Sequence, residues 1–415
     1  MEKIHHVLAN VFSSLRFKNF RYFWLGQCIS VIGTWMQRTA QIWLALELTH
    51  SPFLVGLLTA GQFIPIVILS LPAGTMIDRL DKRKLLLWTQ FGFLLLGVNI
   101  TLLTFFDVVQ YWEVLLNATL YGILQSVDTP TRQSFVIDLV GKKYLLNGIS
   151  LNSSIFNLAK IAGPAIAGLV IVKYGTTFCF FIDTISFIAV LFGLFLIKTQ
   201  PTNQINSNKR TTTLQVDILE GLGYIKNHSD IALTAGLMII VCTLAYNTNV
   251  IIPVYAKNVL NQGAQEYSNL LSATGVGSLL AAILMSYLAR FGTKRKVYLG
   301  VCLGTCLLQV IMLLIHTFMP ALFIMAGIGF CNMIFLNQSN AAFQLSVPNE
   351  LRGRLMSVYV LLNQGTTPLG SLYSGAIMDV TSGIWGFPAC GSLALALLAV
   401  LFMTNSSHIK QWVKE

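Results

Sequence analysis

The chain has 415 residues, of which 55% are hydrophobic and only 10% are charged. A water-soluble protein of this length needs roughly 25% charged residues to cover its surface. The composition therefore excludes a water-soluble protein and predicts a chain whose apolar surface faces lipid. The net charge of +11 would suggest a nucleic-acid partner in a soluble protein. Basic loops also orient membrane proteins, so we expect a lipid bilayer and no nucleic acid.

Twelve apolar runs are each long enough to cross a bilayer as a helix. A hydrocarbon core of about 30 Å needs around 20 helical residues, and backbone polar groups cannot stay unpaired in lipid. The first run, which begins at Phe20, is too long for the apolar core of a signal peptide, so we expect it to remain as a span. The predicted spans are 20–47, 52–77, 85–106, 112–131, 147–172, 177–197, 230–254, 267–289, 297–316, 320–340, 355–378 and 384–404.

The basic residues predict the orientation of these spans. With both termini in the cytoplasm, the inner loops collect 22 of the 27 Lys and Arg residues, whereas the outer loops collect only Lys173 and Lys257. The other three, Arg38, Arg132 and Lys160, fall inside predicted helices or at a helix end. Because short cytoplasmic loops are enriched in Lys and Arg, we expect a multi-pass protein of the bacterial cytoplasmic (inner) membrane with both termini cytoplasmic.

A polar stretch divides the chain near its middle. It opens with TQPTNQINSNKRTTT after Lys198, and such a composition is typical of a linker. Residues 214–227 could then form a short amphipathic helix on the inner membrane surface. We therefore predict an N-terminal six-helix bundle over 1–197, a cytoplasmic linker over 198–229 and a C-terminal six-helix bundle over 230–415.

The two halves resemble each other in sequence. When 140–168 is set against 347–375, Gly163 meets Gly370 and Gly168 meets Gly375. Each segment is a basic loop followed by a glycine-rich span. Such internal duplication is typical of transporters, in which two similar bundles move about a central site.

The sequence offers little sign of a metal site, a cofactor or an enzymatic reaction. Its seven cysteines lie in apolar segments, and no C-x-x-C pattern occurs. Cys302 and Cys306 share a helical face, but small buried residues are the simpler interpretation. Neither a phosphate-binding P-loop nor a nucleophile motif is present. We expect no bound metal, no cofactor and no enzyme activity.

Residues 74–84 are GTMIDRLDKRK. Gly74, Asp78, Arg79 and the basic end that includes Arg83 resemble the G-x-x-x-D-R-x-G-R-R-K loop signature of the major facilitator superfamily, with Asp81 in place of the usual Gly. GTWMQR at 33–38, PTRQ at 130–133 and VPNELRGRLMS at 347–357 resemble the branch of that superfamily that contains secretion effectors, enterobactin exporters and drug-efflux proteins. The resemblance covers nearly all of the chain. It implies twelve helices in two pseudo-symmetric bundles and secondary active transport, with export as the expected direction.

In the resembled superfamily, the loop signature latches the ends of the two bundles. The alternative is a plain basic loop that only orients the chain. We expect a conformational latch, with Arg132 and the start of the eleventh span as partners for Asp78. The predicted latch residues are Gly74, Asp78, Arg79, Arg83 and Arg132.

Gly163, Pro164 and Gly168 on the fifth span resemble the helix signature of antiporters in this superfamily. Small residues permit close helix packing, and a proline inside a helix removes a backbone donor and can kink it. Ordinary helix packing would give the same pattern. The resemblance implies exchange of the substrate for another species.

Ionisable groups inside a membrane are costly and are candidates for function. Lys160 on the fifth span and Asp183 on the sixth fall at a similar depth, so we expect them to form an ion pair, which is either permanent or responsive to protons. Asp128 lies four residues before Arg132, with Pro130 between them. Asp128, Lys160 and Asp183 are the candidates for proton coupling.

Spans one, four, seven and ten line the central cavity in the resembled fold. The residues of these spans that we expect to contact substrate are Arg38, Gln41, Asn247, Asn249 and Asn337. A cationic, amide-lined wall suits an anionic or carbonyl-bearing ligand. Hydrogen bonding between helices is the alternative role for each amide.

These observations together predict a monomeric exporter that exchanges an organic small molecule, such as a siderophore, a metabolite or a drug, for protons. Fold alone does not fix direction or cargo. An importer or a lysophospholipid flippase on the same fold, and a membrane sensor that transports nothing, are the alternatives.

Overall fold

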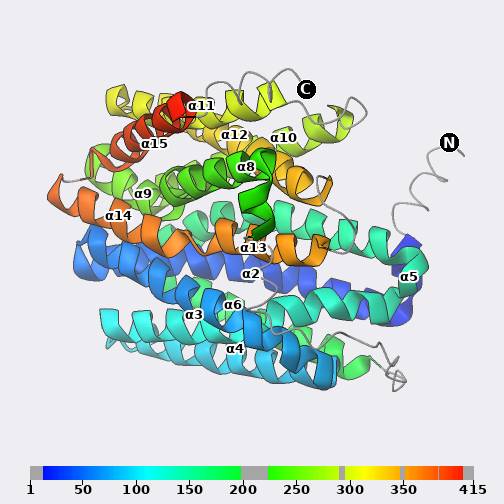
Figure 1. Cartoon of the computed structure of the whole chain (residues 1–415). Helices are drawn as coiled ribbons and strands as arrows, with labels where there is room; N and C mark the ends of the chain where they lie inside the picture. The colour runs from blue at the N-terminus through cyan, green and yellow to red at the C-terminus, as the bar shows by residue number, and fades with distance from the viewer. Residues whose placement is uncertain (1–12, 198–222, 289–294, 346–350, 382, 405–415) are drawn as a thin grey trace, which may run out of the picture. The chain divides into compact units, whose positions relative to one another are not determined.

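The computed structural model describes residues 13–197, 223–288, 295–345, 351–381 and 383–404. Across these ranges the protein is helical, without strands (Figure 1). An all-helical chain follows from the composition, because a helix pairs its own backbone groups without help from water. The elements are η1 (Ser13–Arg16), α2 (Lys18–Thr49), α3 (Pro52–Arg79), α4 (Lys82–Phe105), α5 (Tyr111–Tyr174), α6 (Thr176–Leu196), α8 (Ser229–Ile240), η2 (Val241–Ala245), α9 (Thr248–Val254), η3 (Tyr255–Val259), α10 (Ala264–Leu288), α11 (Arg295–Ile311), η5 (Met312–Leu314), α12 (Phe318–Leu345), α13 (Arg352–Gln364), α14 (Thr367–Val380) and α15 (Gly386–Thr404).

The predicted spans all fall on these helices. In the described part of the chain, nine stretches are long and apolar enough to cross a membrane. The predicted spans 20–47, 112–131 and 355–378 are not among the nine. The first of these includes Gln27, Gln37 and Gln41, which are buried inside the protein. Polar side chains of this kind lower a helix's hydropathy without placing charge against lipid.

Particular residues end the helices. Asp81 caps α4 by accepting hydrogen bonds from the backbone N–H groups of Arg83 (2.9 Å) and Lys84 (3.2 Å), as expected for Asp at this position. The fourth and fifth predicted spans run together as α5 and are separated only by Gly141, whose φ is +71°. Gly175, with φ of +81°, then separates α5 from α6. Both glycines occupy a conformation that side-chain-bearing residues rarely adopt.

The chain forms two compact units. The first unit comprises Met1–Leu44 and Ile64–Lys209, and the second unit comprises Ala45–Phe63 and Arg210–Glu415. The corner between α2 and α3 therefore belongs to the second unit, where it packs on α14. A Cβ atom at Gly56 would overlap the backbone of Ser371, and one at Gly375 would lie 2.8 Å from the carbonyl oxygen of Pro52. Two glycines thus allow close contact between these helices. The predicted amphipathic helix lies mostly outside the described residues, although 223–227 is helical.

The first unit packs α4 against both α5 and α6. Phe93 of α4 stacks on Phe187 of α6, with ring centroids 5.5 Å apart, and lies 4.5 Å from the ring of Tyr121 on α5. A second cluster joins Phe23 of α2 to Phe135 of α5 at 5.8 Å. Aromatic contacts of this kind fix the neighbouring helices in register.

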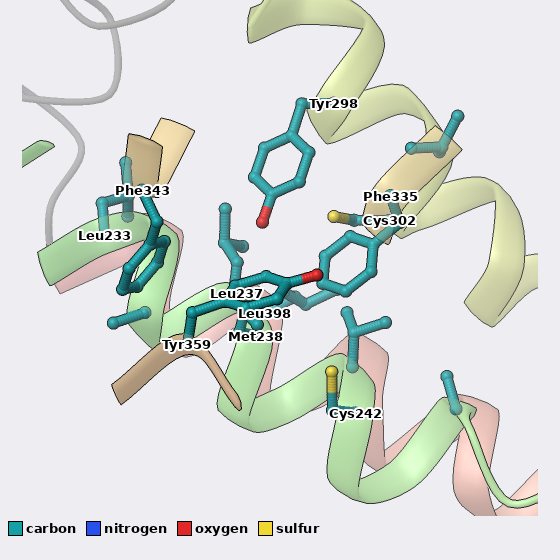
Figure 2. Packing of buried hydrophobic residues seen from close by; sticks show 14 of the residues in the cluster. Leu233, Leu237, Met238, Cys242, Tyr298, Cys302, Phe335, Phe343, Tyr359 and Leu398 are labelled. Carbon is teal, nitrogen blue, oxygen red and sulfur yellow. The ribbon is translucent and has the colours of Figure 1, made fainter. Parts of the chain in front are cut away.

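The second unit pairs α10 with α12 and α11 with α15 (Figure 1). Its core gathers side chains from several of these helices (Figure 2). Tyr298 stacks on Phe335 with ring centroids 5.3 Å apart and an interplanar angle of 5°, and its hydroxyl lies 2.8 Å from that of Ser339. The buried tyrosine hydroxyl therefore has a partner, as such groups require.

Large apolar side chains also cover the outside of both units. Trp88, Phe195 and Leu314 are 73%, 66% and 75% exposed. Exposed apolar surface on this scale is suited to lipid contact. The exterior thus agrees with the membrane location predicted from the composition.

Candidate functional site

The loop between α3 and α4 is tied to the rest of the first unit by its basic residues. Lys82 Nζ lies 2.8 Å from Asp138 Oδ2 on α5 and donates to the carbonyl of Ser134. Arg83 donates from Nε to the carbonyl of Leu194 (2.9 Å) and from Nη2 to that of Phe195 (3.0 Å). A cation at the last carbonyls of a helix also complements the helix dipole. Arg83 therefore caps the end of α6.

The predicted latch is described only in part. Gly74, Asp78 and Arg79 lie on the last turns of α3, but their side chains are outside the described part of the structure. Arg132 pairs with Asp128, which is one turn earlier on α5. The latch therefore remains a prediction.

Both carboxylate oxygens of Asp128 accept hydrogen bonds. One oxygen, Oδ1, accepts hydrogen bonds from Thr89 Oγ1 and Gln90 Nε2 of α4, each at 2.8 Å. The other, Oδ2, accepts from two guanidinium nitrogens of Arg132. The helix continues through Pro130, so the proline does not prevent this ion pair. The arrangement joins α4 to α5 by a charge-assisted network.

Gly163 lies against α2. A Cβ atom at this position would overlap the Cβ of Trp35 and lie 3.2 Å from the carbonyl oxygen of Ile32. Pro164 is inside α5, which continues through it, and Gly168 is buried one turn later. The close packing expected of a small residue is thus present at Gly163.

Asp183 is buried in α6, with 2% of its surface exposed, and it faces α2. Its Oδ1 atom accepts hydrogen bonds from the hydroxyls of Thr34 (3.4 Å) and Ser186 (3.5 Å). A Cβ atom at Gly33 would lie only 3.0 Å from this oxygen, so the glycine leaves room for the carboxyl group.

The predicted ion pair between Lys160 and Asp183 is wrong. The ion pairs Lys82–Asp138, Arg132–Asp128 and Arg295–Asp230 contain neither Lys160 nor Asp183. Helical rise alone gives the depth of a side chain and not the direction in which it points. The two residues do share a depth in the sequence prediction, but the carboxyl of Asp183 is directed at the hydroxyls of α2 and its own helix.

The substrate-contact candidates of the first unit already have neighbours within α2 and α5. Arg38 lies over the ring of Trp35, 5.5 Å from its centroid. Gln41 is buried, accepts a hydrogen bond from Gln37 and donates to the carbonyl of Val114 at 3.4 Å. The structure brings a cation and two amides together on α2.

The candidates of the second unit lie on an interrupted helix and on α12. Asn247 is 2% exposed and sits between η2 and α9, whereas Asn249 is half-buried on α9. Asn337 is half-buried on α12, and Asn332, one of its neighbours on that helix, is buried. No group of three or more His, Cys, Asp or Glu in the described part of the chain could hold a metal ion.

Four hydrogen bonds between helices were not predicted from the sequence. Thr89 and Gln90 bind Asp128, Gln309 of α11 donates to the carbonyl of Ala245 at 2.9 Å, and Asp379 of α14 accepts from Ser51 Oγ at 2.8 Å. Each contact joins helices that are far apart in the chain, so no local pattern reports it.

Comparison with known proteins decides the family. A family model described as "transmembrane secretion effector" matches residues 9–414. The protein belongs to this family of major facilitator transporters. The family is one of multi-pass membrane transporters. The loop at 74–84 predicted the superfamily, and 33–38, 130–133 and 347–357 predicted the secretion-effector branch.

Curated relatives of this transporter carry siderophores or drugs, according to their names. The staphyloferrin A transporter of Staphylococcus aureus is 27% identical over 392 residues, which are 93% of this chain and 96% of that protein. The multidrug efflux pump Tap of Mycolicibacterium fortuitum is 22% identical over 366 residues, covering 86% and 88%. The macrolide efflux protein A of Streptococcus pyogenes is 19% identical over 388 residues, covering 92% and 95%.

Solved structures establish the major facilitator fold. The nucleoside transporter NupG matches with a TM-score of 0.75 at 12% identity, over 93% of this chain and 98% of that one. A bacterial homologue of the human lysosomal transporter Spinster, in an inward-facing and unoccupied conformation, matches with a TM-score of 0.72 at 12% identity, over 92% and 95%. At these identities the similarity concerns the fold.

Proposed function

We propose that this transporter exports an organic small molecule of the siderophore, metabolite or drug kind in exchange for protons. It works as a monomer in the bacterial cytoplasmic membrane, with both termini cytoplasmic. Curated relatives that cover most of the chain are named for a siderophore, for multiple drugs and for macrolides. These names support an organic cargo and two of them support export.

The observation that carries the coupling proposal is Asp183. It is a buried carboxyl group whose hydrogen-bond donors are hydroxyls, and none of the ion pairs described above includes it. A buried carboxyl without a cation is expensive in a membrane, and such residues mark proton pathways. A proton can neutralise this group directly, so we assign Asp183 as the coupling residue.

Asp128 and Lys160 are weaker candidates on the same grounds. Asp128 is held by Arg132, Thr89 and Gln90, so protonating it would break four favourable contacts. Lys160 is half-buried on α5 and could respond to a neighbouring charge. In this proposal Asp128 has a structural role and Lys160 tunes the site.

The substrate contacts in the proposal come from both units. Arg38 and Gln41 supply a cation and an amide, and Asn247, Asn249 and Asn337 supply further amides. Asp78, Arg79 and Arg132 control the change between inward-open and outward-open states, with Gly74 and Arg83 supporting that loop. Gly163, Pro164 and Gly168 allow the close contact of α5 with α2 that exchange requires.

The test uses proteoliposomes that hold the full-length protein and are loaded to an acidic interior. Radiolabelled staphyloferrin A and a radiolabelled macrolide serve as probes. The inside-out fraction of the wild type should accumulate at least one probe when the interior is acidic, and collapse of the pH gradient should abolish this. Accumulation that requires an alkaline interior would instead indicate symport with protons, as expected of an importer.

Asp183→Asn should reduce gradient-driven accumulation of the probe tenfold or more, because an amide cannot take up and release a proton. The same variant should keep exchange of labelled for unlabelled probe, since exchange needs no net proton movement. Ser186→Ala, which removes one neighbouring hydroxyl and keeps the carboxyl, is the matched control. Gradient-driven accumulation by Asp183→Asn at the wild-type level would rule out the coupling role.

A further inference from the structure

The segment Ser229–Val259 is not one continuous α-helix. α8 ends in the π-helical turn η2, Tyr246 and Asn247 leave helical geometry with ψ of 3° and 28°, and α9 leads into a second π-helical turn, η3. Wide turns of this kind occur often at functional sites. Interrupted helices also form ligand sites in transporters, because their backbone groups are not all used within the helix.

Side-chain amides bind three consecutive carbonyl groups at this interruption. Asn247 Nδ2 donates to the carbonyl of Thr243 (2.5 Å) and approaches that of Leu244 (3.4 Å). Gln309 Nε2 of α11 donates to the carbonyl of Ala245 at 2.9 Å. Asn247 acts from within the segment, whereas Gln309 acts from a different helix. Gln309 therefore anchors the interruption to the rest of the second unit.

The packing around Gln309 is built for this contact. Gln309 is fully buried, and a Cβ atom at Gly391 of α15 would lie 2.9 Å from the Cβ of Gln309. On the other side of the interruption, a Cβ atom at Gly370 of α14 would overlap the carbonyl oxygen of Thr243 and the amide of Asn247. Glycines on two helices thus leave space for the two amides.

A buried amide is a costly way to fill space. The Oε1 atom of Gln309 and the Oδ1 atom of Asn247 are both buried without a hydrogen-bond partner in the structure. A leucine or methionine of similar size would avoid that cost. Unlike leucine or methionine, the glutamine donates a hydrogen bond to the carbonyl of Ala245. This bond is what the buried amide adds.

We propose that Gln309 is a positioning residue: it clamps the junction between α8 and α9 and so fixes the direction of Asn247 and Asn249. The clamp itself is independent of the cargo, and its effect on binding rests on the substrate contacts assigned under the proposed function. The unpaired Oδ1 of Asn247 is an acceptor, so the ligand group it takes is an N–H or O–H donor.

The experiment compares Gln309→Met with Thr305→Val in the full-length protein. Methionine keeps the volume of glutamine and cannot donate to Ala245. Thr305 is buried one turn earlier on α11 and donates to the carbonyl of Val301 in its own helix, so Thr305→Val removes a polar group without touching the junction. Hydrogen–deuterium exchange of the peptides covering 241–254 measures the junction, and the melting temperature in detergent reports global folding.

Gln309→Met should speed exchange in 241–254 by about tenfold, with the other peptides and the melting temperature close to wild type. It should also raise the KM for staphyloferrin A or the macrolide by about five- to tenfold, as expected for the loss of one buried hydrogen bond, while kcat changes less than twofold. Thr305→Val should leave the junction and the KM unchanged.

If hydrogen–deuterium exchange in 241–254 is as slow in Gln309→Met as in the wild type, the clamp is ruled out, whatever the cargo is. A KM raised by Asn247→Ala but not by Gln309→Met would overturn the positioning role and leave the proposed substrate contact intact. If exchange rises and neither variant changes the KM, the clamp stands, and the assignment of Asn247 as a substrate contact is wrong. If Gln309→Met fails to fold, Gln309→Leu is measured in the same way.

Discussion

At the scale of single residues, the two buried carboxyl groups of the first unit, Asp128 and Asp183, have very different hydrogen-bond donors around them. Asp128 has a cation and two further donors around it, whereas Asp183 has two hydroxyls at 3.4 and 3.5 Å. The sequence identified both residues, because an acid inside an apolar run is conspicuous. It could not identify their partners, because Thr89, Gln90 and Thr34 are ordinary helix residues until tertiary packing brings them close.

Asp128→Ala should lower the free energy of unfolding by about 3–5 kcal/mol, because it leaves the buried guanidinium of Arg132 without its counter-ion. Lys82→Ala removes a salt bridge whose side chains are each 27% exposed, so its cost should stay below about 1 kcal/mol. Thermal unfolding of both variants in the same detergent measures the difference. Equal losses of melting temperature would show that burial does not distinguish the two pairs.

At the scale of helices, nine of the twelve apolar runs coincide with described stretches that are long and apolar enough to cross a membrane, since lipid leaves the backbone no alternative to helix. The interruptions were harder. The sequence placed a loop over 132–146, but the structure shows α5 crossing this region with only Gly141 as a break. The π-helical turns around Asn247 were also missed, because contacts with distant residues, such as that of Gln309 with Ala245, do not show in a hydropathy pattern.

Gly141→Ala should destabilise the protein by about 1–3 kcal/mol, because its φ of +71° with ψ of 170° is a backbone region that essentially only glycine occupies. No atom lies within 4 Å of the Cβ position, so the loss reports backbone strain alone. Gly141→Asn should cost about as much, because asparagine tolerates positive φ mainly in the left-handed helical region, where ψ is far smaller than at Gly141. The matched control is Gly300→Ala in α11, where the Cβ position is also open and φ is ordinary. Thermal unfolding that ranks Gly300→Ala as the more damaging change would contradict this account.

At the scale of the whole molecule, composition and the loop at 74–84 were sufficient to predict the fold and the family. They could not predict which residues pack in each unit. Ala45–Phe63 belongs by contact to the second unit, although it precedes the linker by a long distance in the chain. Such membership is a property of packing between distant segments, and the two glycines that allow it, Gly56 and Gly375, resemble any other glycines of an apolar helix.

The proposed orientation predicts which loops are accessible from outside the cell. In a background without the seven native cysteines, Asp107→Cys should react with a membrane-impermeant maleimide in intact cells. Lys84→Cys should react only after the membrane is opened, because the basic loops lie on the cytoplasmic side. Labelling of both positions from the same side would contradict the topology.

The contact between Ser51 and Asp379 has a consequence for how the protein is made. Asp379 accepts from Ser51 Oγ and also approaches the backbone N–H of Phe53 at 3.5 Å, so α14 supplies an acceptor to the first turn of α3. The two residues are 328 positions apart. The ribosome therefore completes α3 long before its acceptor exists, and a nascent chain that has not yet reached α14 must leave this helix start to water or to the insertion machinery.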